Sequence, residues 1–331
     1  MSREFDTALS QPIGTPDGIR GSGKFGTVTA SDGYKLKFRH WKAQSPRGIV
    51  VAVHGIQSHS GWYEYSSWHM ANAGFDVYLA DRRGSGVNGL DRGHADHGLR
   101  LVNDVRTLIR HARAISEGKV SEPRMPLCLA GISWGGKIAA ATAALFPNEI
   151  DQLAFLYPGL EPRLQPSFLQ RIQLRAARDF DVRRRQVPVP LSDPTMFTAN
   201  PFWQRAIAAD PLALHTVTSG FINSGYHLDM IVRERCRHIA HPLLLMLAGQ
   251  DQIIDNDRTQ RRIMTFSSNC IHMHRYPQAR HTLEFEENRN LFVGHIIAWL
   301  REQTRRDSSG VTADSDLHEG QESSSSTERP Y

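Results

Sequence analysis

The feature that most constrains the fold is a series of short, strand-like runs that alternate with stretches of helical periodicity. Most of the runs are apolar on both faces, as expected for strands of a sheet that is covered on both sides. The runs lie at residues 48–53, 75–80, 126–130, 153–157, 243–248 and 271–276. Helical periodicity lies at residues 62–73, 101–115, 137–145, 258–265 and 291–300. This alternation predicts an α/β fold with a mostly parallel central sheet and helices on both faces.

Two further extended segments precede the first apolar run. Residues 27–30 and 34–41 favour β structure, and they flank the sequence Ser31-Asp32-Gly33. An Asp-Gly turn between two such segments is typical of an antiparallel hairpin. The preceding residues 11–24 are rich in Gly and Pro, which indicates a flexible lead-in.

The interruption between the two groups of apolar runs is of a different kind. It has an amphipathic stretch near residues 164–178, and further helical pieces near residues 201–209 and 228–237. We interpret it as a mostly helical insertion over the carboxyl edge of the sheet, where open α/β folds bind ligands. Most of its apolar side chains are expected simply to pack on the core. The segment after residue 305 is too polar to bury enough surface to offset its chain entropy. We therefore expect a flexible lead-in at residues 1–24, an α/β core at residues 25–158 and 242–304, a helical cap insertion at residues 159–241, and a disordered tail at residues 305–331.

Composition excludes several classes of protein. Hydrophobic residues make up 40% of the 331 residues and charged residues 22%, which excludes global disorder. No apolar run approaches the roughly 18 residues of a membrane span, and the N-terminus lacks the layout of a signal peptide. Cys128, Cys236 and Cys270 are odd in number and lack metal spacing. They favour a reducing, cytoplasmic compartment, without a disulfide framework or a bound metal.

The net charge of +5 makes an anionic partner possible. Positive side chains gather in the insertion, at Arg171, Arg175, Arg178 and residues 183–185. They could contact an anionic membrane surface peripherally, although a solvated helix face explains them equally well. No recognition helix, zinc finger or aromatic–basic RNA motif accompanies the charge. Nucleic acid is therefore not an expected partner.

The motif Gly131-Ile132-Ser133-Trp134-Gly135 directly follows one apolar run and precedes a helical stretch. A sharp strand-to-helix turn needs glycine where a Cβ would meet neighbouring backbone, and it leaves the central side chain exposed and strained. Ser133 is then a candidate nucleophile on an elbow formed with Gly131 and Gly135. The Trp134 N–H at the helix N-terminus is free to donate to an oxyanion. The alternative is a glycine-rich turn with an incidental serine.

A serine nucleophile needs a carboxylate and a base further along the chain. Asp251 lies three residues beyond the apolar run 243–248 and is the preferred carboxylate. Asp255 and Asp257 are competitors, but capping of the following helix is a sufficient role for both.

His281 is the preferred base. It falls in a loop after the run 271–276, at the edge of the sheet expected to hold Ser133 and Asp251. His272 and His274 fall within that run, and His295 falls within the last helical stretch. We expect His281 to take the Ser133 proton and return it to the leaving group, while Asp251 orients the imidazole.

The second oxyanion donor is expected from a loop after an earlier strand. The run 48–53 is followed by His54-Gly55-Ile56, and the Ile56 N–H is the candidate donor. His54 precedes Ser133 in the chain, which is the wrong place for the base. A role in stabilising the loop is favoured.

These motifs, in this order, resemble the α/β-hydrolase superfamily, and within it the monoacylglycerol lipase and lysophospholipase branch of serine aminopeptidase S33 type. The resemblance covers about residues 28–300. The strings that carry it are His54-Gly55-Ile56-Gln57-Ser58-His59-Ser60-Gly61-Trp62-Tyr63, Asp81-Arg82-Arg83-Gly84-Ser85-Gly86, Ala209-Asp210-Pro211-Leu212, Ala248-Gly249-Gln250-Asp251 and Tyr276-Pro277-Gln278-Ala279-Arg280-His281.

The resemblance implies a cofactor-free serine hydrolase that forms an acyl-enzyme on single-chain lipid esters, such as monoacylglycerols or lysophospholipids. Three positions depart from the usual pattern of the branch: Gln57-Ser58 stands where Gly-Glu is common, Ser85 replaces a common His, and Trp134 is bulkier than usual. None of them removes a member of the triad, but they leave the substrate open. The alternatives are a carboxylesterase or thioesterase for small soluble esters, an acyltransferase, and a non-catalytic binding scaffold.

Overall fold

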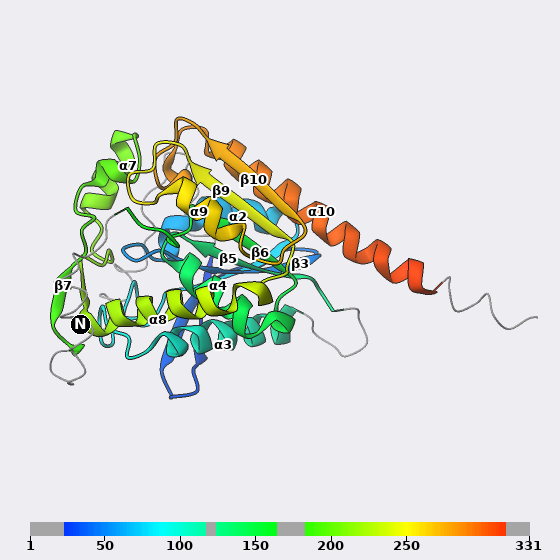
Figure 1. Ribbon diagram of the computed structural model, residues 1–331, viewed down its shortest axis with the longest axis horizontal. Helices are drawn as coiled ribbons and strands as arrows, with labels where there is room; N and C mark the ends of the chain where they lie inside the picture. The colour runs from blue at the N-terminus through cyan, green and yellow to red at the C-terminus, as the bar shows by residue number, and fades with distance from the viewer. Residues whose placement is uncertain (1–22, 117–123, 164–182, 316–331) are drawn as a thin grey trace, which may run out of the picture.

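The computed structural model describes residues 23–116, 124–163 and 183–315, with the side chains of the last helix described as far as residue 305. Its centre is a sheet of eight strands in the order β1-β2-β4-β3-β5-β6-β9-β10 (Figure 1). The pairs β1–β2 and β2–β4 are antiparallel, and from β4 to β10 every neighbouring pair is parallel. The predicted α/β class is confirmed. The strands are β1 Lys24–Thr29, β2 Lys35–Trp41, β3 Gly48–Val53, β4 Phe75–Ala80, β5 Leu127–Ile132, β6 Gln152–Leu156, β9 Leu243–Ala248 and β10 Ile271–Tyr276.

Helices cover both faces of this sheet (Figure 1). One face is covered by α3 and α4, against which α8 packs; the other carries α2 and α10. The helices are α2 Glu64–Asn72, α3 Gly98–Ser116, α4 Gly135–Leu145, α7 Pro201–Ala208, α8 Ser219–Arg235, α9 Asn256–Ile263 and α10 Arg289–Ser315. Among the described residues, no helix combines the length and apolar character required to cross a membrane.

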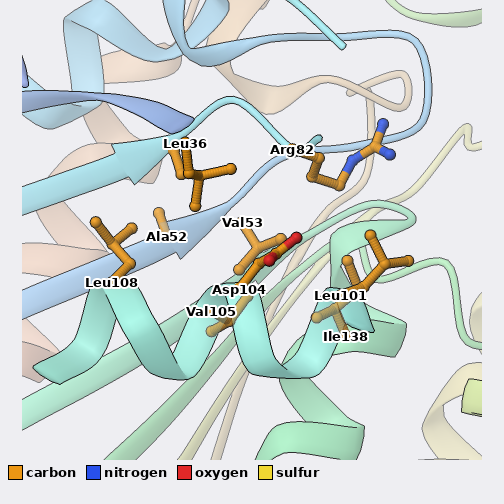
Figure 2. A pocket seen from close by; sticks show the side chains of 10 residues that line it. Leu36, Ala52, Val53, Arg82, Leu101, Asp104, Val105, Leu108 and Ile138 are labelled. Carbon is orange, nitrogen blue, oxygen red and sulfur yellow. The ribbon is translucent and has the colours of Figure 1, made fainter. Parts of the chain in front are cut away.

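The core lies where the central strands meet these helices. Every residue of β3, β5 and β9 is buried, which explains why their sequences are apolar without alternation. Helix α3 places Leu101, Val105 and Leu108 toward the sheet at helical spacing. A cavity of about 20 Å³ remains between α3 and the sheet (Figure 2), large enough for about one water molecule.

The segment between β6 and β9 is held against the core by a buried carboxylate. Asp210 accepts hydrogen bonds from Trp62 Nε1 (2.6 Å) and His59 Nε2 (2.9 Å), both of which precede α2 in the chain. The segment contains α7 and α8 as expected. It also contains a small antiparallel pair, β7 (Gln186–Pro188) and β8 (Thr216–Thr218), which the sequence pattern did not predict. Strands of three residues are too short to show a periodicity.

Two helices extend beyond the predicted bounds. Helix α8 begins at Ser219, where the Thr218 hydroxyl accepts the Phe221 N–H as an N-cap. Helix α10 continues to Ser315, whereas a disordered tail was expected from residue 305. Once a helix is nucleated on the core, each further residue adds a backbone hydrogen bond at little cost. The amphipathic helix expected near residues 164–178, the lead-in up to residue 22 and the tail beyond residue 315 lie outside the described residues.

Candidate active site

Ser133 follows the last residue of β5 and has a left-handed backbone, with φ at 50°. Such a conformation is strained for a residue with a side chain. The glycines beside it permit the turn. A Cβ on Gly135 would lie 2.2 Å from the Val53 carbonyl oxygen, and one on Gly131 would lie 2.7 Å from Gly136 Cα. Only glycine fits at these two positions, so the turn takes the shape that the sequence motif predicts.

Two hydrogen bonds join the three predicted triad residues. The Ser133 hydroxyl lies 2.8 Å from His281 Nε2, and His281 Nδ1 lies 2.8 Å from Asp251 Oδ2. With the imidazole proton on Nδ1 facing the carboxylate, Nε2 is left to accept the Ser133 proton. The other oxygen, Asp251 Oδ1, accepts the N–H groups of Ile253 (2.8 Å) and Ile254 (2.9 Å), which holds the carboxylate in place.

Sheet topology explains why residues so far apart in sequence meet. Ser133 follows β5, Asp251 follows β9 and His281 follows β10, and these strands lie in the order β5-β6-β9-β10. Because the strands are parallel, their carboxyl ends reach the same edge of the sheet. Ser133 is half-buried, while Asp251 and His281 are buried.

The competing candidates lie in other contacts. Asp255 caps α9 by accepting the Arg258 N–H at 2.9 Å, and Asp257 lies in the first turn of the same helix. His274 stacks on His295 with ring centroids 4.1 Å apart, and His295 Nδ1 bonds the Tyr276 hydroxyl at 2.9 Å. These contacts give the competing aspartates and histidines structural roles away from Ser133.

One predicted oxyanion donor lies in the loop after β3, and the other is the residue that follows Ser133 in the chain. A Cβ on Gly55 would lie 3.1 Å from Ser133 Cβ, so the loop after β3 runs directly beside the serine. Within the described ranges, the backbone N–H groups of Ile56 and Trp134 have no hydrogen-bond acceptor. Two unpaired N–H groups beside the Ser133 hydroxyl could serve as donors to an oxyanion, as predicted for these residues.

His54 holds this loop. Burial lowers the pKa of His54 to about 3, so its imidazole is neutral. Nε2 accepts the Arg82 N–H at 2.9 Å, which leaves the proton on Nδ1 to be donated to the Gly55 carbonyl oxygen at 2.8 Å. The favoured interpretation of His54 as a loop-stabilising residue agrees with these bonds.

The three departures from the resembled pattern occupy buried or half-buried positions near the serine. Gln57 and Ser58 are buried. The Gln57 backbone carbonyl oxygen accepts a hydrogen bond from the Leu214 N–H, and the Ser58 hydroxyl oxygen accepts one from the Tyr63 hydroxyl. The Ser85 hydroxyl donates to the Arg82 carbonyl oxygen at 3.0 Å. Trp134 stacks on Phe221 of α8 with centroids 4.5 Å apart, so α8 packs against the residue that follows Ser133.

Sequence reasoning missed two buried polar residues near the predicted triad, Tyr157 and Glu284. Tyr157 also has a positive φ, 39°, and its ring meets His281 edge-on at 4.9 Å. Glu284, three residues after His281, is also buried, and its Oε1 accepts the Ser66 N–H at 2.9 Å. Burial raises the pKa of Glu284 to about 7. The only signal in the sequence was the position of Glu284 three residues after His281, which by itself predicts no burial.

Comparison with known proteins agrees with this geometry. The mostly parallel sheet, the elbow and the three residues at its edge define a member of the α/β-hydrolase class. A family model described as serine aminopeptidase, S33, matches residues 44–288. The chain therefore belongs to that family.

The sequence identity to individual relatives is low. The chain is 25% identical over 270 residues to a monoacylglycerol lipase of Mycolicibacterium smegmatis, covering 81% of this chain and 93% of that protein. A crystal structure of a monoacylglycerol lipase from Paleococcus ferrophilus superposes with a TM-score of 0.69 at 23% identity, covering 81% of this chain and 99% of the other. A soluble variant of the Saccharomyces cerevisiae monoglyceride lipase, in complex with a substrate analogue, gives 0.74 at 20% identity, covering 86% and 95%. The chain is a hydrolase that acts on ester bonds.

The buried Glu284 carboxyl predicts a pH-dependent stability. Because its pKa is raised from 4.5 to about 7 in the folded state, the folded protein binds more protons than the unfolded chain between these pH values. The free energy of unfolding therefore falls as pH rises through this window, by roughly 3 kcal/mol in total. Glu284→Gln removes the ionisation, so we expect the variant to gain roughly 2–3 kcal/mol relative to wild type between about pH 5 and about pH 8.

Urea unfolding at the two pH values measures this difference. Glu287→Gln, at an exposed carboxyl nearby, controls for the loss of one negative charge. If the stability of Glu284→Gln relative to wild type is the same at both pH values, the carboxyl does not titrate in this window.

Proposed function

We propose that the chain is a serine hydrolase that cleaves single-chain lipid esters of the monoacylglycerol or lysophospholipid type through an acyl-enzyme on Ser133. The observation that carries this proposal is the pair of 2.8 Å hydrogen bonds that links Ser133 to His281 and His281 to Asp251. A hydroxyl bonded to an imidazole that a carboxylate orients can lose its proton as it attacks.

In the first half of the reaction, Ser133 Oγ attacks the ester carbonyl carbon and its proton passes to His281 Nε2. The electron pair of the carbonyl moves to the oxygen, which becomes an oxyanion facing the N–H groups of Ile56 and Trp134. Asp251 stabilises the imidazolium that forms and is not itself protonated. The tetrahedral intermediate then breaks its bond to the leaving alcohol, which receives the proton from His281.

In the second half, water takes the place of the alcohol. His281 accepts a proton from the water as its oxygen attacks the acyl carbon, and a second oxyanion occupies the same donors. Collapse of this intermediate releases the fatty acid and returns the proton to Ser133 Oγ. An acyltransferase differs only in that an alcohol replaces water in this half.

The substrate class is proposed from the relatives. The compared proteins include monoacylglycerol lipases of Mycolicibacterium smegmatis and Paleococcus ferrophilus and a monoglyceride lipase of Saccharomyces cerevisiae. Small soluble esters are the second candidate, because one similar structure is a carboxyl esterase of Bacillus coagulans, at 17% identity and a TM-score of 0.73. Both classes of ester are cleaved by the same chemistry, so the shape of the substrate-binding site at Ser133 decides which class is hydrolysed. The expected cytoplasmic location stays a prediction.

Substitution of the two nearby aspartates tests the roles of the triad. Asp251→Asn is expected to keep the fold but to lower kcat by about 10⁴-fold, because the imidazole loses its oriented tautomer. Asp255→Asn is the matched control and should change kcat little, since Asp255 caps α9. Ser133→Ala should abolish labelling by a fluorophosphonate probe. Equal losses of kcat at both aspartates would show that Asp251 is not the triad carboxylate.

A substrate panel tests the lipid assignment. With purified protein, we expect kcat/KM to be higher for a monoacylglycerol or a lysophosphatidylcholine than for the diacyl lipid of the same chain length. A 4-nitrophenyl butyrate control reports the chemical competence of each preparation. Hydrolysis of the aryl ester with no release of fatty acid from either single-chain lipid would replace the lipid assignment with that of a soluble esterase.

Peripheral membrane contact is a separate part of the proposal. Residues 183–185 are exposed arginines, and Arg184 pairs with Asp91 at 2.8 Å; Arg171, Arg175 and Arg178 lie outside the described residues. We expect the protein to sediment with vesicles that contain phosphatidylglycerol more than with phosphatidylcholine vesicles. Arg183→Glu with Arg185→Glu should reduce the difference. Equal sedimentation with both vesicles would exclude an electrostatic contact.

A further inference from the structure

Arg82 is a buried cation without a carboxylate partner in the described part of the chain. It follows β4 at the carboxyl edge of the sheet and is 5% exposed. The neighbouring Asp81 carboxylate accepts the N–H groups of Ser60 and Val87 instead. Burying a guanidinium without an anion is costly, and an apolar side chain of similar size fills space without that cost. We therefore expect the buried charge of Arg82 to serve a function that an apolar side chain could not.

The guanidinium faces the oxyanion loop. In Figure 2 it points away from the apolar side chains of the small cavity, to which Arg82 contributes part of the lining. Nη2 donates to the carbonyl oxygens of Gly55 and Ile56, each at 2.8 Å. The guanidinium carbon also lies 5.1 Å from the ring centroid of Trp134 and 5.2 Å from that of Phe221. Arg82 thus contacts both residues that are proposed to supply oxyanion donors.

The bond to Gly55 acts on the donor itself. The Gly55 carbonyl and the Ile56 N–H belong to one peptide unit, and in a planar trans peptide they point in opposite directions. Anchoring the oxygen on the Arg82 side therefore aims the N–H to the opposite side. The His54 Nδ1–H donates to the same oxygen at 2.8 Å. A flip of this peptide would break two hydrogen bonds, one of them to a charged donor.

The charge adds to the effect of the geometry. Burial lowers the pKa of Arg82 to about 9, which leaves the guanidinium charged at neutral pH. Within the described residues, Nε and Nη1 are buried and make no hydrogen bond. The Asp81 carboxylate lies close enough to act on this charge electrostatically but forms no ion pair with it. A positive charge one peptide unit behind the oxyanion stabilises the negative charge that develops there.

We propose that Arg82 is a positioning residue of the oxyanion hole: it locks the Gly55–Ile56 peptide with its N–H toward Ser133 and supports the oxyanion by its charge. The proposal rests on the roles given above to Ser133 and Ile56. It predicts that loss of Arg82 weakens binding of the tetrahedral intermediate more than binding of the substrate.

Three variants test it on the full-length protein with 4-nitrophenyl butyrate as substrate. Arg82→Gln removes the charge, and Arg82→Lys keeps the charge but loses the planar fork of donors. Arg83→Gln is the matched control: Arg83 is the next residue, and its guanidinium pairs with Asp104 (2.6 Å) and Asp32 (3.0 Å), away from the carbonyl groups that Arg82 binds. Each variant is also titrated with a trifluoromethyl ketone, which forms an oxyanion adduct with a serine nucleophile, and with the ether analogue of the substrate, which forms none.

For Arg82→Gln we expect kcat to fall at least about tenfold, toward the 10²–10³-fold typical of losing one donor. KM and the affinity for the ether should change less than about threefold, and the affinity for the ketone should fall in proportion to kcat/KM. Arg82→Lys should lie between Arg82→Gln and wild type. Arg83→Gln should keep the wild-type ratio of ketone to ether affinity, even if its melting temperature falls.

Several outcomes overturn the proposal. A folded Arg82→Gln enzyme with the wild-type kcat shows that the loop needs no anchor. Equal losses of affinity for the ketone and the ether show that Arg82 only shapes the pocket. If neither Arg82 variant accumulates as folded protein while Arg83→Gln does, Arg82 is a structural core residue. Two other results would instead reject the proposed function: the wild type fails to hydrolyse the aryl ester, or Ser133→Ala still hydrolyses it.

Discussion

The left-handed backbone at Ser133 is the constraint on which the rest of the site depends. It costs about 1–3 kcal/mol for a residue with a side chain, and the surrounding bonds hold it. The Ser133 N–H donates to the Leu156 carbonyl oxygen at 3.0 Å, and the Ser133 carbonyl oxygen accepts the N–H groups of Gly136 (2.8 Å) and Gly159 (2.6 Å). The end of β6, the loop after it and the start of α4 therefore hold this conformation together. The result is a hydroxyl presented at the edge of the sheet in a single orientation.

Around this hydroxyl, buried polar groups are fixed by one another and by the backbone. Asp251 is held by two N–H groups, His54 bridges two loops, and Arg82 binds two carbonyl oxygens. Such groups are costly to bury unless they are bonded, and once bonded they resist movement. A site built in this way is preorganised, so little reorganisation is required when charge develops on the substrate.

Much of the fold was predictable because its signals are local. The bounds of β3, β4, β9 and β10 equal those of the runs predicted at 48–53, 75–80, 243–248 and 271–276. A central parallel strand is buried on both faces, so its sequence is a nearly continuous apolar run that can be recognised directly. The start of α8, the end of α10 and the pair β7–β8 were not predictable, because capping, helix propagation and short cross-strand pairing depend on what lies nearby in space.

The candidate site divides in the same way. The sequence by itself determined the elbow at Ser133 and the candidates Asp251 and His281, because glycines around a serine and polar residues just after apolar runs are local patterns whose order follows the parallel sheet. The tertiary structure alone decided which polar groups meet: Glu284 bonds the Ser66 N–H, Asp210 bonds Trp62, and Arg82 bonds the carbonyl of Gly55. The physical reason is that hydrogen bonding between distant segments depends on strand order and on side-chain direction at the sheet edge, and neither leaves a periodic trace along the chain.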